Sequence, residues 1–258
     1  MKILLRFLAS LRGLLLPLLL IAAWEYMSRQ GASQAYAFVP LSKIGAGLDE
    51  LLASGELWLS VAASLERTCL GLLYGVLAGF AVGALMAHSR IAERLLAPLY
   101  HTLRQVPILG LIPLLALWFG SGEFSKVLIV SLAAFYPMVL NSFEGFSHVE
   151  KSYQEVGRIY TLTPLQQFTQ VQLPSALPSL SNGVLHALAF AWVSSVGCEL
   201  FLSTGMGLGN LMMNAETGSR MEVVVIGVLC IGLLGYTMNQ LFTRLSRHLL
   251  RWRNLRDR

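Results

Sequence analysis

The residue types that most often carry out catalysis or bind metals occur in this sequence, but their spacing matches no common catalytic pattern. Its 258 residues include five histidines without an HExxH or comparable spacing, and three cysteines without a CxxC pair. The stretch 120–126 lacks the spacing of a GxxxxGK(S/T) phosphate loop, and the glycine-rich stretch 205–209 is followed by Asn210, which breaks a dinucleotide fingerprint. We therefore predict no catalytic residue, no metal site and no cofactor bound by this chain.

Titratable side chains inside long apolar stretches are the next candidates for function. Arg104 stands beside Pro107 within an apolar stretch, and a charge in a membrane span must face protein or water rather than lipid. Two roles stay open for it: a structural pairing, with Glu144 or Glu199 as partner, or direct contact with an anionic substrate. His186 and Glu199 are the other residues that we assign to a substrate path.

A polar stretch beginning at Glu150 predicts two short helices between apolar stretches. In the first, Tyr153, Val156 and Tyr160 form an apolar stripe at helical spacing. In the second, Thr163 is expected to cap the helix, with proline at the first helical position and a glutamine completing a capping box. Such a loop predicts a contact surface for a partner. The alternative, a helix pair lying on lipid, has little basic charge to support it.

The elements that must position these residues are membrane-spanning helices. The sequence is 55% hydrophobic and only 13% charged, which excludes disorder, collagen and a disulfide-stapled secreted domain. A helix needs about 20 apolar residues to cross a bilayer. On that basis we predict an all-α polytopic membrane protein with spans at 9–28, 63–87, 95–119, 126–145, 175–201 and 222–244. Prolines 107 and 113 should kink or interrupt the third span.

The second predicted span carries a glycine at every fourth position. These residues, Gly71, Gly75, Gly79 and Gly83, form overlapping GxxxG motifs. This spacing lets another helix approach backbone to backbone, and the alternative is that the glycines serve as hinges in a moving helix.

Basic residues gather at both ends of the chain and predict its orientation. The formal net charge is +5, and lysines and arginines crowd the N-terminal segment and residues 244–258. Because cytoplasmic flanks hold positive charge, both termini are expected in the cytoplasm and the polar stretch lies on the same side. Nucleic-acid binding is disfavoured, since no aromatic residues interleave the basic run. A cleaved signal peptide ending near Ala37 is the alternative to a retained first helix.

The polar stretch also carries a family resemblance. From Glu155 to Pro178 it resembles the EAA loop of ABC importer permeases, with 155–157 in the EAA position and 171–174 matching the closing I-x-L-P. Two positions depart from the pattern: Gly157 replaces the last alanine, and Thr161 stands where the family usually has glycine. Further likenesses occur at 64–67, 104–107, 112–113, 117–120 and 205–209. The combination is most similar to the nitrate, sulfonate and taurine branch.

The resemblance implies a type I ABC importer permease core with an extra N-terminal helix, in the bacterial inner membrane. It divides the chain into an N-terminal helix with its external connection (1–60), the core (61–245) with a cytoplasmic coupling loop at 147–174, and a basic tail (246–258). It also implies an external substrate-binding protein, a second copy of the permease, and ATPase subunits that use ATP and magnesium. The stretch 205–209 would be an external re-entrant or gating segment, or a plain turn.

The resulting hypothesis is that closure of the ATPase subunits pushes the paired helices of the loop and tilts the membrane helices. Glu155 would contact the ATPase or hold the loop through Arg158, and Gly157 would permit close approach. The full coupling set is Tyr153, Glu155, Val156, Gly157, Arg158, Thr161, Leu162, Thr163 and Leu165.

Two other classes of function stay open at this stage. An ion-coupled carrier explains the spans but leaves the polar loop without a use. An intramembrane enzyme lacks a recognisable catalytic grouping.

Overall fold

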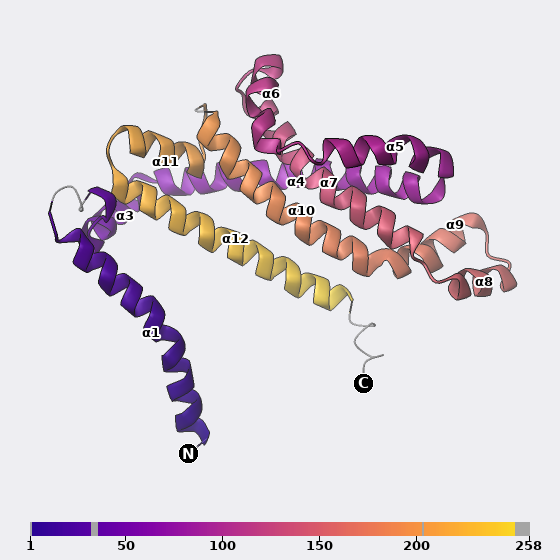
Figure 1. Cartoon of the computed structure of the whole chain (residues 1–258), viewed down its shortest axis with the longest axis horizontal. Helices are drawn as coiled ribbons and strands as arrows, with labels where there is room; N and C mark the ends of the chain where they lie inside the picture. Colours follow the sequence, from indigo (N-terminus) through magenta and orange to yellow (C-terminus); the bar gives the residue numbers. More distant parts are fainter. Residues whose placement is uncertain (1, 32–35, 203, 251–258) are drawn as a thin grey trace. The chain divides into compact units, whose positions relative to one another are not determined.

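The computed structural model describes residues 2–31, 36–202 and 204–250, and their regular structure is helical throughout (Figure 1). Within these ranges the side chains of 2–14, 151, 154, 156 and 158 stay outside the description. The chain divides into two compact units. Unit 1 comprises residues 1–58 and 211–230, and unit 2 comprises residues 59–210 and 231–258.

Unit 1 holds the N-terminal helix and a short amphipathic helix. Its elements are α1 (Lys2–Ser28), α3 (Leu41–Ser54), most of α11 (Leu208–Thr217) and the first part of α12 (Met221–Leu249). The indole of Trp24 donates to the carbonyl of Val39 at 2.8 Å, and the Glu25 carboxylate accepts from the backbone N–H of Leu41 at 3.1 Å. These two bonds fix the connection between α1 and α3.

Unit 2 holds the remaining helices. They are α4 (Glu56–His88), α5 (Arg90–Leu103), η1 (Ile108–Leu111), α6 (Ile112–Phe119), α7 (Glu123–Ser147), α8 (Lys151–Ile159), α9 (Pro164–Gln167), η2 (Phe168–Gln172), α10 (Leu173–Phe201) and the rest of α12. Helices α7 and α10 pack along each other. Their core contains Ile129, Val130 and Ala134 of α7 against Ala187 and Ala191 of α10, all shielded from solvent.

The predicted all-α membrane fold is confirmed. Four helices of the described residues, α4, α7, α12 and the run 164–201, are long and apolar enough to cross a membrane. The first predicted span, 9–28, lies within α1, whose described apolar part is Leu15–Ser28.

The third predicted span is broken. Helix α5 ends at Leu103, and the axis of Ile108–Phe119 is bent by 84° from that of α5. Pro107 precedes η1 and Pro113 sits in the first turn of α6, where a missing N–H is tolerated. Counted as one span, the bent pair raises the number of candidate spans among the described residues to five.

The glycines of α4 lie directly against α7. A Cβ atom at Gly79 would stand 2.7 Å from the carbonyl oxygen of Phe135, and one at Gly83 would stand 2.5 Å from that of Val139. Gly75 meets the carbonyl oxygen of Ser131 in the same way, and Gly71 lies against the side chain of Val130, both on preceding turns of α7. Because each later glycine of α4 meets a later turn of α7, the two helices run parallel with their backbones in close contact.

Candidate functional site

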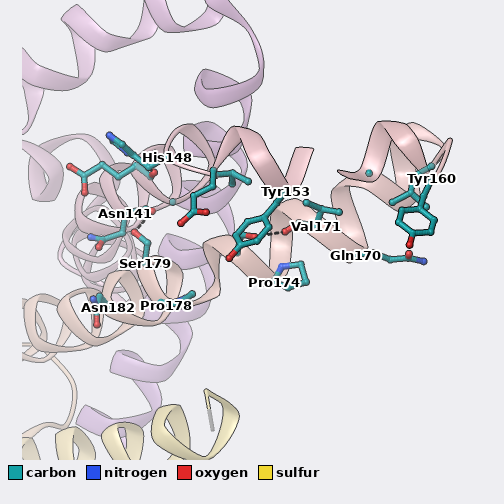
Figure 2. Close-up of a pocket in the computed structure, with 17 residues that line it drawn as sticks. Asn141, His148, Tyr153, Tyr160, Gln170, Val171, Pro174, Pro178, Ser179 and Asn182 are labelled. Carbon is teal, nitrogen blue, oxygen red and sulfur yellow. Dashed lines mark hydrogen bonds between the residues drawn. The ribbon is translucent and has the colours of Figure 1, made fainter. Parts of the chain in front are cut away.

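The polar segment, residues 147–174, folds into α8, α9 and η2 and borders a cavity of about 1210 Å³ (Figure 2). Helix α7 contributes Asn141, Glu144 and Gly145, and the start of α10 contributes Pro174 and Pro178, among others. In Figure 2, Asn141, Ser179 and Asn182 lie at one end of this cavity, and Tyr160 and Gln170 lie at the other. The cavity thus joins the polar segment to the ends of two spanning helices.

The turn between α8 and α9 is built on Thr161. Its φ of +53° is left-handed, a conformation in which a β-branched residue is strained and glycine is not. The backbone N–H of Leu162 then donates to the carbonyl of Gly157 at 3.1 Å. Position 161, where EAA loops usually carry glycine, therefore requires a left-handed backbone conformation.

The capping box predicted for the second helix is confirmed. The backbone N–H of Gln166 donates to the Thr163 hydroxyl at 3.4 Å, and the Gln166 side chain accepts from the backbone N–H of Thr163 at 2.9 Å. Helix α9 ends at Gln167, and the chain continues as the π-helix η2 into α10. Such π-helical turns are rare and often mark functional positions.

Gly157 is buried by a neighbour within the segment. The side-chain amide of Gln167 lies directly over its Cα, so that any Cβ atom at position 157 would collide with it. The group that closely approaches Gly157 is thus Gln167, from the second half of the same segment. This contact holds α8 against the end of α9.

The tip of the segment exposes apolar side chains. Ile159, Tyr160 and Leu165 have exposed fractions of 78%, 73% and 72%. Glu155, Thr161 and Thr163 are also exposed, whereas Tyr153 and Leu162 are half-buried. Helix α8 ends at Ile159, so Tyr160 lies just beyond the helix that carries Tyr153. The side chains of Val156 and Arg158 lie outside the described residues, and so does the expected Glu155–Arg158 contact.

The last residue of α4 contacts the π-helix. Nε2 of His88 lies 2.8 Å from the side-chain oxygen of Gln172, and Nδ1 of His88 lies 2.8 Å from the carbonyl oxygen of Ala84. The same ring lies within 5.9 Å, between centroids, of Phe146 on α7 and Phe168 on η2, which stack on each other at 5.6 Å. Three elements meet at this junction.

A group of charged side chains surrounds Arg67, which lies in the first half of α4. Arg67 binds Glu199 of α10 and makes two bonds to Glu123 of α7, at 2.9 Å from Nε and 2.8 Å from Nη2. Lys126 lies 3.6 Å from the Glu123 carboxylate. Arg67, Lys126 and Glu199 are buried, and Glu123 is partly exposed. We name these four residues the ion cluster.

The ion cluster holds the glycine loop, residues 204–209. Arg67 donates to the carbonyl of Met206 at 3.1 Å, and the Glu199 carboxylate accepts from the backbone N–H of Gly209 at 2.8 Å. Ser64 donates to Glu199 and accepts from the N–H of Leu208 at 2.9 Å. Lys126 donates to the carbonyl of Thr204. The loop is therefore fastened along its length by side chains of α4, α7 and α10.

Two glycines make this fastening possible. Gly205 and Gly207 have φ values of +79° and +156°, and a Cβ at Gly207 would stand 2.5 Å from the Glu199 carboxylate. Only a residue without a side chain fits there.

The structure does not bring the three predicted substrate-path residues together. Glu199 is buried and bound to Arg67, so the pairing of Glu199 with Arg104 is wrong. Arg104 is exposed beyond the end of α5, with its guanidinium 5.7 Å from the ring centroid of Tyr100. His186 is exposed on α10.

Sequence reasoning missed the roles of Arg67 and Lys126. A signal for each was present, because Ser64 and Arg67 are three residues apart on one helical face, as are Glu123 and Lys126, at the edges of apolar spans. Nothing in the sequence, however, indicated that Glu199 would join them.

Several apolar helices, one of them broken, together with an intervening polar segment, define a multi-pass membrane protein. Residues 71–252 match the family described as the binding-protein-dependent transport system inner membrane component. The chain belongs to this family of transport permeases.

Curated relatives agree with this assignment. An aliphatic sulfonates transport permease protein, SsuC of Bacillus subtilis strain 168, is 35% identical over 95% of this chain and 88% of its own length. The taurine transport system permease protein TauC of Escherichia coli K12 is 33% identical over 76% of this chain and 71% of its own. The nitrate import permease protein NrtB of Leptolyngbya laminosa is 29% identical over 76% and 68%.

Solved structures share the fold. An inward-facing chain of the MetNI methionine ABC transporter superposes with a TM-score of 0.59 at 20% identity, covering 75% of this chain and 97% of that chain. A chain of an amino acid ABC transporter crystallised with histidines gives 0.57 at 19% identity, covering 79% and 97%. The type I importer permease fold expected from the sequence is confirmed.

Proposed function

We propose that this chain imports a small sulfonate or a related anion, as the permease of an ATP-driven, binding-protein-dependent transporter. The substrate class is supported by the relatives named for aliphatic sulfonates, taurine and nitrate, of which the sulfonate relative aligns with 95% of this chain. Alkanesulfonates are the first substrates to test.

The observation that carries the ATP-driven part is the exposed apolar tip of the polar segment. Ile159, Tyr160 and Leu165 stand outward on a segment whose base is tied down by capping and by Gln167. An exposed apolar patch on an ordered polar segment marks a protein contact. The partner proposed here is an ATPase subunit, which binds ATP and magnesium. Glu155 of α8 is exposed as well.

The orientation proposed for the chain follows from its basic residues. Arg90 and Arg94 follow the end of α4, and Arg244 and Arg247 occupy the end of α12. With these groups in the cytoplasm, both termini and the polar segment are cytoplasmic, and the glycine loop is external. An external binding protein would then deliver substrate on the side of the glycine loop, and a second copy of the permease would complete the path.

The mechanism is a movement of packed elements without covalent chemistry in this chain. Closure of the ATPase subunits would displace the tip of the polar segment, and the rigid base would pass that displacement to α7 and α10, which flank the cavity. Arg104 and His186 remain proposals for the substrate path, because both are exposed at membrane-embedded helices.

A growth experiment tests the substrate and the coupling together. A deletion strain is grown on ethanesulfonate, taurine or nitrate as single sulfur or nitrogen sources, with sulfate and ammonium as controls and plasmid rescue for each. Selective loss on one anion, restored by the wild-type gene, is the expected result. Normal growth on all three anions would remove this substrate class.

The variant Glu155→Arg separates coupling from folding. It should reach the membrane at the wild-type level yet fail to restore growth, because a reversed charge faces the ATPase surface. Glu216→Arg is the matched control: Glu216 is also an exposed glutamate, on α11, and this change should restore growth. Full rescue by Glu155→Arg would contradict the proposed docking role of Glu155.

A further inference from the structure

Helix α4 makes specific side-chain contacts at two separated places, at His88, its last residue, and around Arg67 in its first half. Between Arg67 and His88 it has no break, and at 1.5 Å per residue this length is about 32 Å, close to the thickness of a bilayer's hydrocarbon core. One end meets the polar segment and the other meets the glycine loop.

At the first end, His88 joins α4 to the π-helix. Its hydrogen bond to Gln172 crosses from α4 to the residue that directly precedes α10. Its ring also lies against Phe168, the first residue of η2, and Phe146. A displacement of η2 therefore acts on the end of α4 through a polar and an aromatic contact.

Along its middle, α4 cannot slide freely on α7. A Cβ at Gly75 would stand 2.6 Å from the Cβ of Ala134, and one at Gly83 would stand 2.6 Å from that of Ser142. Backbones packed this closely resist sliding past each other, because interfaces without voids have few alternative arrangements.

Around Arg67, side chains of α4 contact both the glycine loop and the ion cluster. Ser64 accepts from Leu208, Arg67 donates to Met206, and both bind Glu199. A shift of α4 therefore pulls directly on the loop backbone.

We propose that His88 and Gln172 are positioning residues that tie α4 to the polar segment, so that α4 transmits displacement of that segment to the glycine loop. The inference rests on the proposed function, since it takes the polar segment to be the part moved by the ATPase. The inference adds a connection from the polar segment to the glycine loop through α4. Docking of an ATPase on the polar segment would not by itself require that connection.

The test measures movement of the glycine loop in the assembled transporter. Met206, whose side chain is exposed, is replaced by cysteine in a background with Cys69, Cys198 and Cys230 changed to alanine, and is labelled with an environment-sensitive fluorophore. The permease is reconstituted with its ATPase subunits in lipid nanodiscs. Fluorescence is then compared before and after trapping with ATP, magnesium and vanadate, and ATP hydrolysis is measured on the same samples.

Two variants remove the connection from opposite sides. His88→Ala removes both contacts of the ring, and Gln172→Ala removes only the hydrogen bond and leaves the aromatic cluster intact, which guards against a folding defect in the first. His101→Ala is the matched control, because His101 is an exposed histidine on α5 that contacts the neighbouring Tyr100. Contacts of this kind typically change the ratio of two conformations by about threefold to tenfold. We therefore expect the ATP-dependent fluorescence change to fall by about fivefold in both variants.

The expected result is that both variants still hydrolyse ATP while the loop signal is reduced, and that His101→Ala behaves as wild type. A full loop signal in Gln172→Ala or in a hydrolysing His88→Ala protein would overturn the proposal. Loss of hydrolysis in both would overturn it as well, by placing these residues in ATPase docking. Absence of an ATP-dependent signal in the labelled protein that keeps His88 and Gln172 also overturns the proposal. Failure of the proposed function is recognised separately, because Glu155→Arg would then hydrolyse ATP as the wild type does.

Discussion

Arg67 on α4 binds Glu199 on α10, and both side chains are buried, at 2% and 0% exposure. The two residues are far apart in the sequence, and their pairing joins the first half of α4 to the last turn of α10. The Glu199 carboxylate also accepts from Ser64 and from the backbone of Gly209, so that its oxygens are fully bonded. An ion pair satisfied in this way is compatible with burial.

Removing one member of this pair should destabilise the protein strongly. Arg67→Gln leaves the Glu199 carboxylate buried without its cation, and such changes destabilise by about 3–5 kcal/mol. We expect a lower unfolding temperature of the detergent-purified protein, measured by intrinsic fluorescence.

A double variant separates the ion pair from the rest of the site. Arg67→Gln with Glu199→Gln should be more stable than the sum of the two single changes predicts, because no lone charge remains. Strict additivity would show that the pair contributes no coupling.

The packing of α4 on α7 predicts a sharp difference between neighbouring positions. Gly79→Leu places a side chain where the Phe135 carbonyl and Met138 already lie, and overpacking of this kind typically destabilises by about 1–3 kcal/mol. Ala78→Leu is the control, since Ala78 is exposed on the same helix. Thermal unfolding of both variants should show a loss for Gly79→Leu alone. Equal stability of the two would contradict the close approach of the helices.

The turn of the polar segment predicts a stabilising change. Thr161 adopts a left-handed conformation that disfavours it by about 1–2 kcal/mol relative to glycine, so Thr161→Gly should relieve strain. Protease resistance of the segment in membranes should increase or stay equal, with growth rescue preserved. Thr163→Gly offers a comparison at the neighbouring cap, where glycine loses only a few tenths of a kcal/mol. Faster cleavage of Thr161→Gly would show that the threonine side chain itself is needed.

The glycine loop predicts a position that accepts no side chain. Gly207→Ala brings a Cβ against the Glu199 carboxylate in a left-handed backbone, so the loop must leave its site or the ion cluster must rearrange. We expect a lower unfolding temperature and impaired growth rescue. Gly232→Ala is the control, because a Cβ at that helical position meets nothing within 4 Å. Wild-type behaviour of Gly207→Ala would contradict the fastening of the loop.

The sequence indicated local features correctly because their causes are local. The capping box at Thr163 needs only residues 163 and 166, and the break in the third span follows from prolines 107 and 113. The four-residue glycine spacing likewise predicts a close helix contact, although it does not identify the partner helix.

The features that escaped prediction depend on residues brought together by packing. Arg67 and Glu199 are separated by more than a hundred positions, and no sequence pattern relates them. Gly157 was expected to permit a close approach, and the group that approaches it is Gln167 of the same segment. The short α9 and the π-helix after it reflect how the chain enters α10, which helical periodicity does not reveal.

The ion cluster also determines what a charged solute meets at that end of the protein. Arg67 and Lys126 carry two positive formal charges, and Glu123 and Glu199 carry two negative ones, so the group as a whole is neutral. Its most accessible member is the carboxylate of Glu123. Taken as a group, these side chains therefore present no net positive charge to an approaching anion.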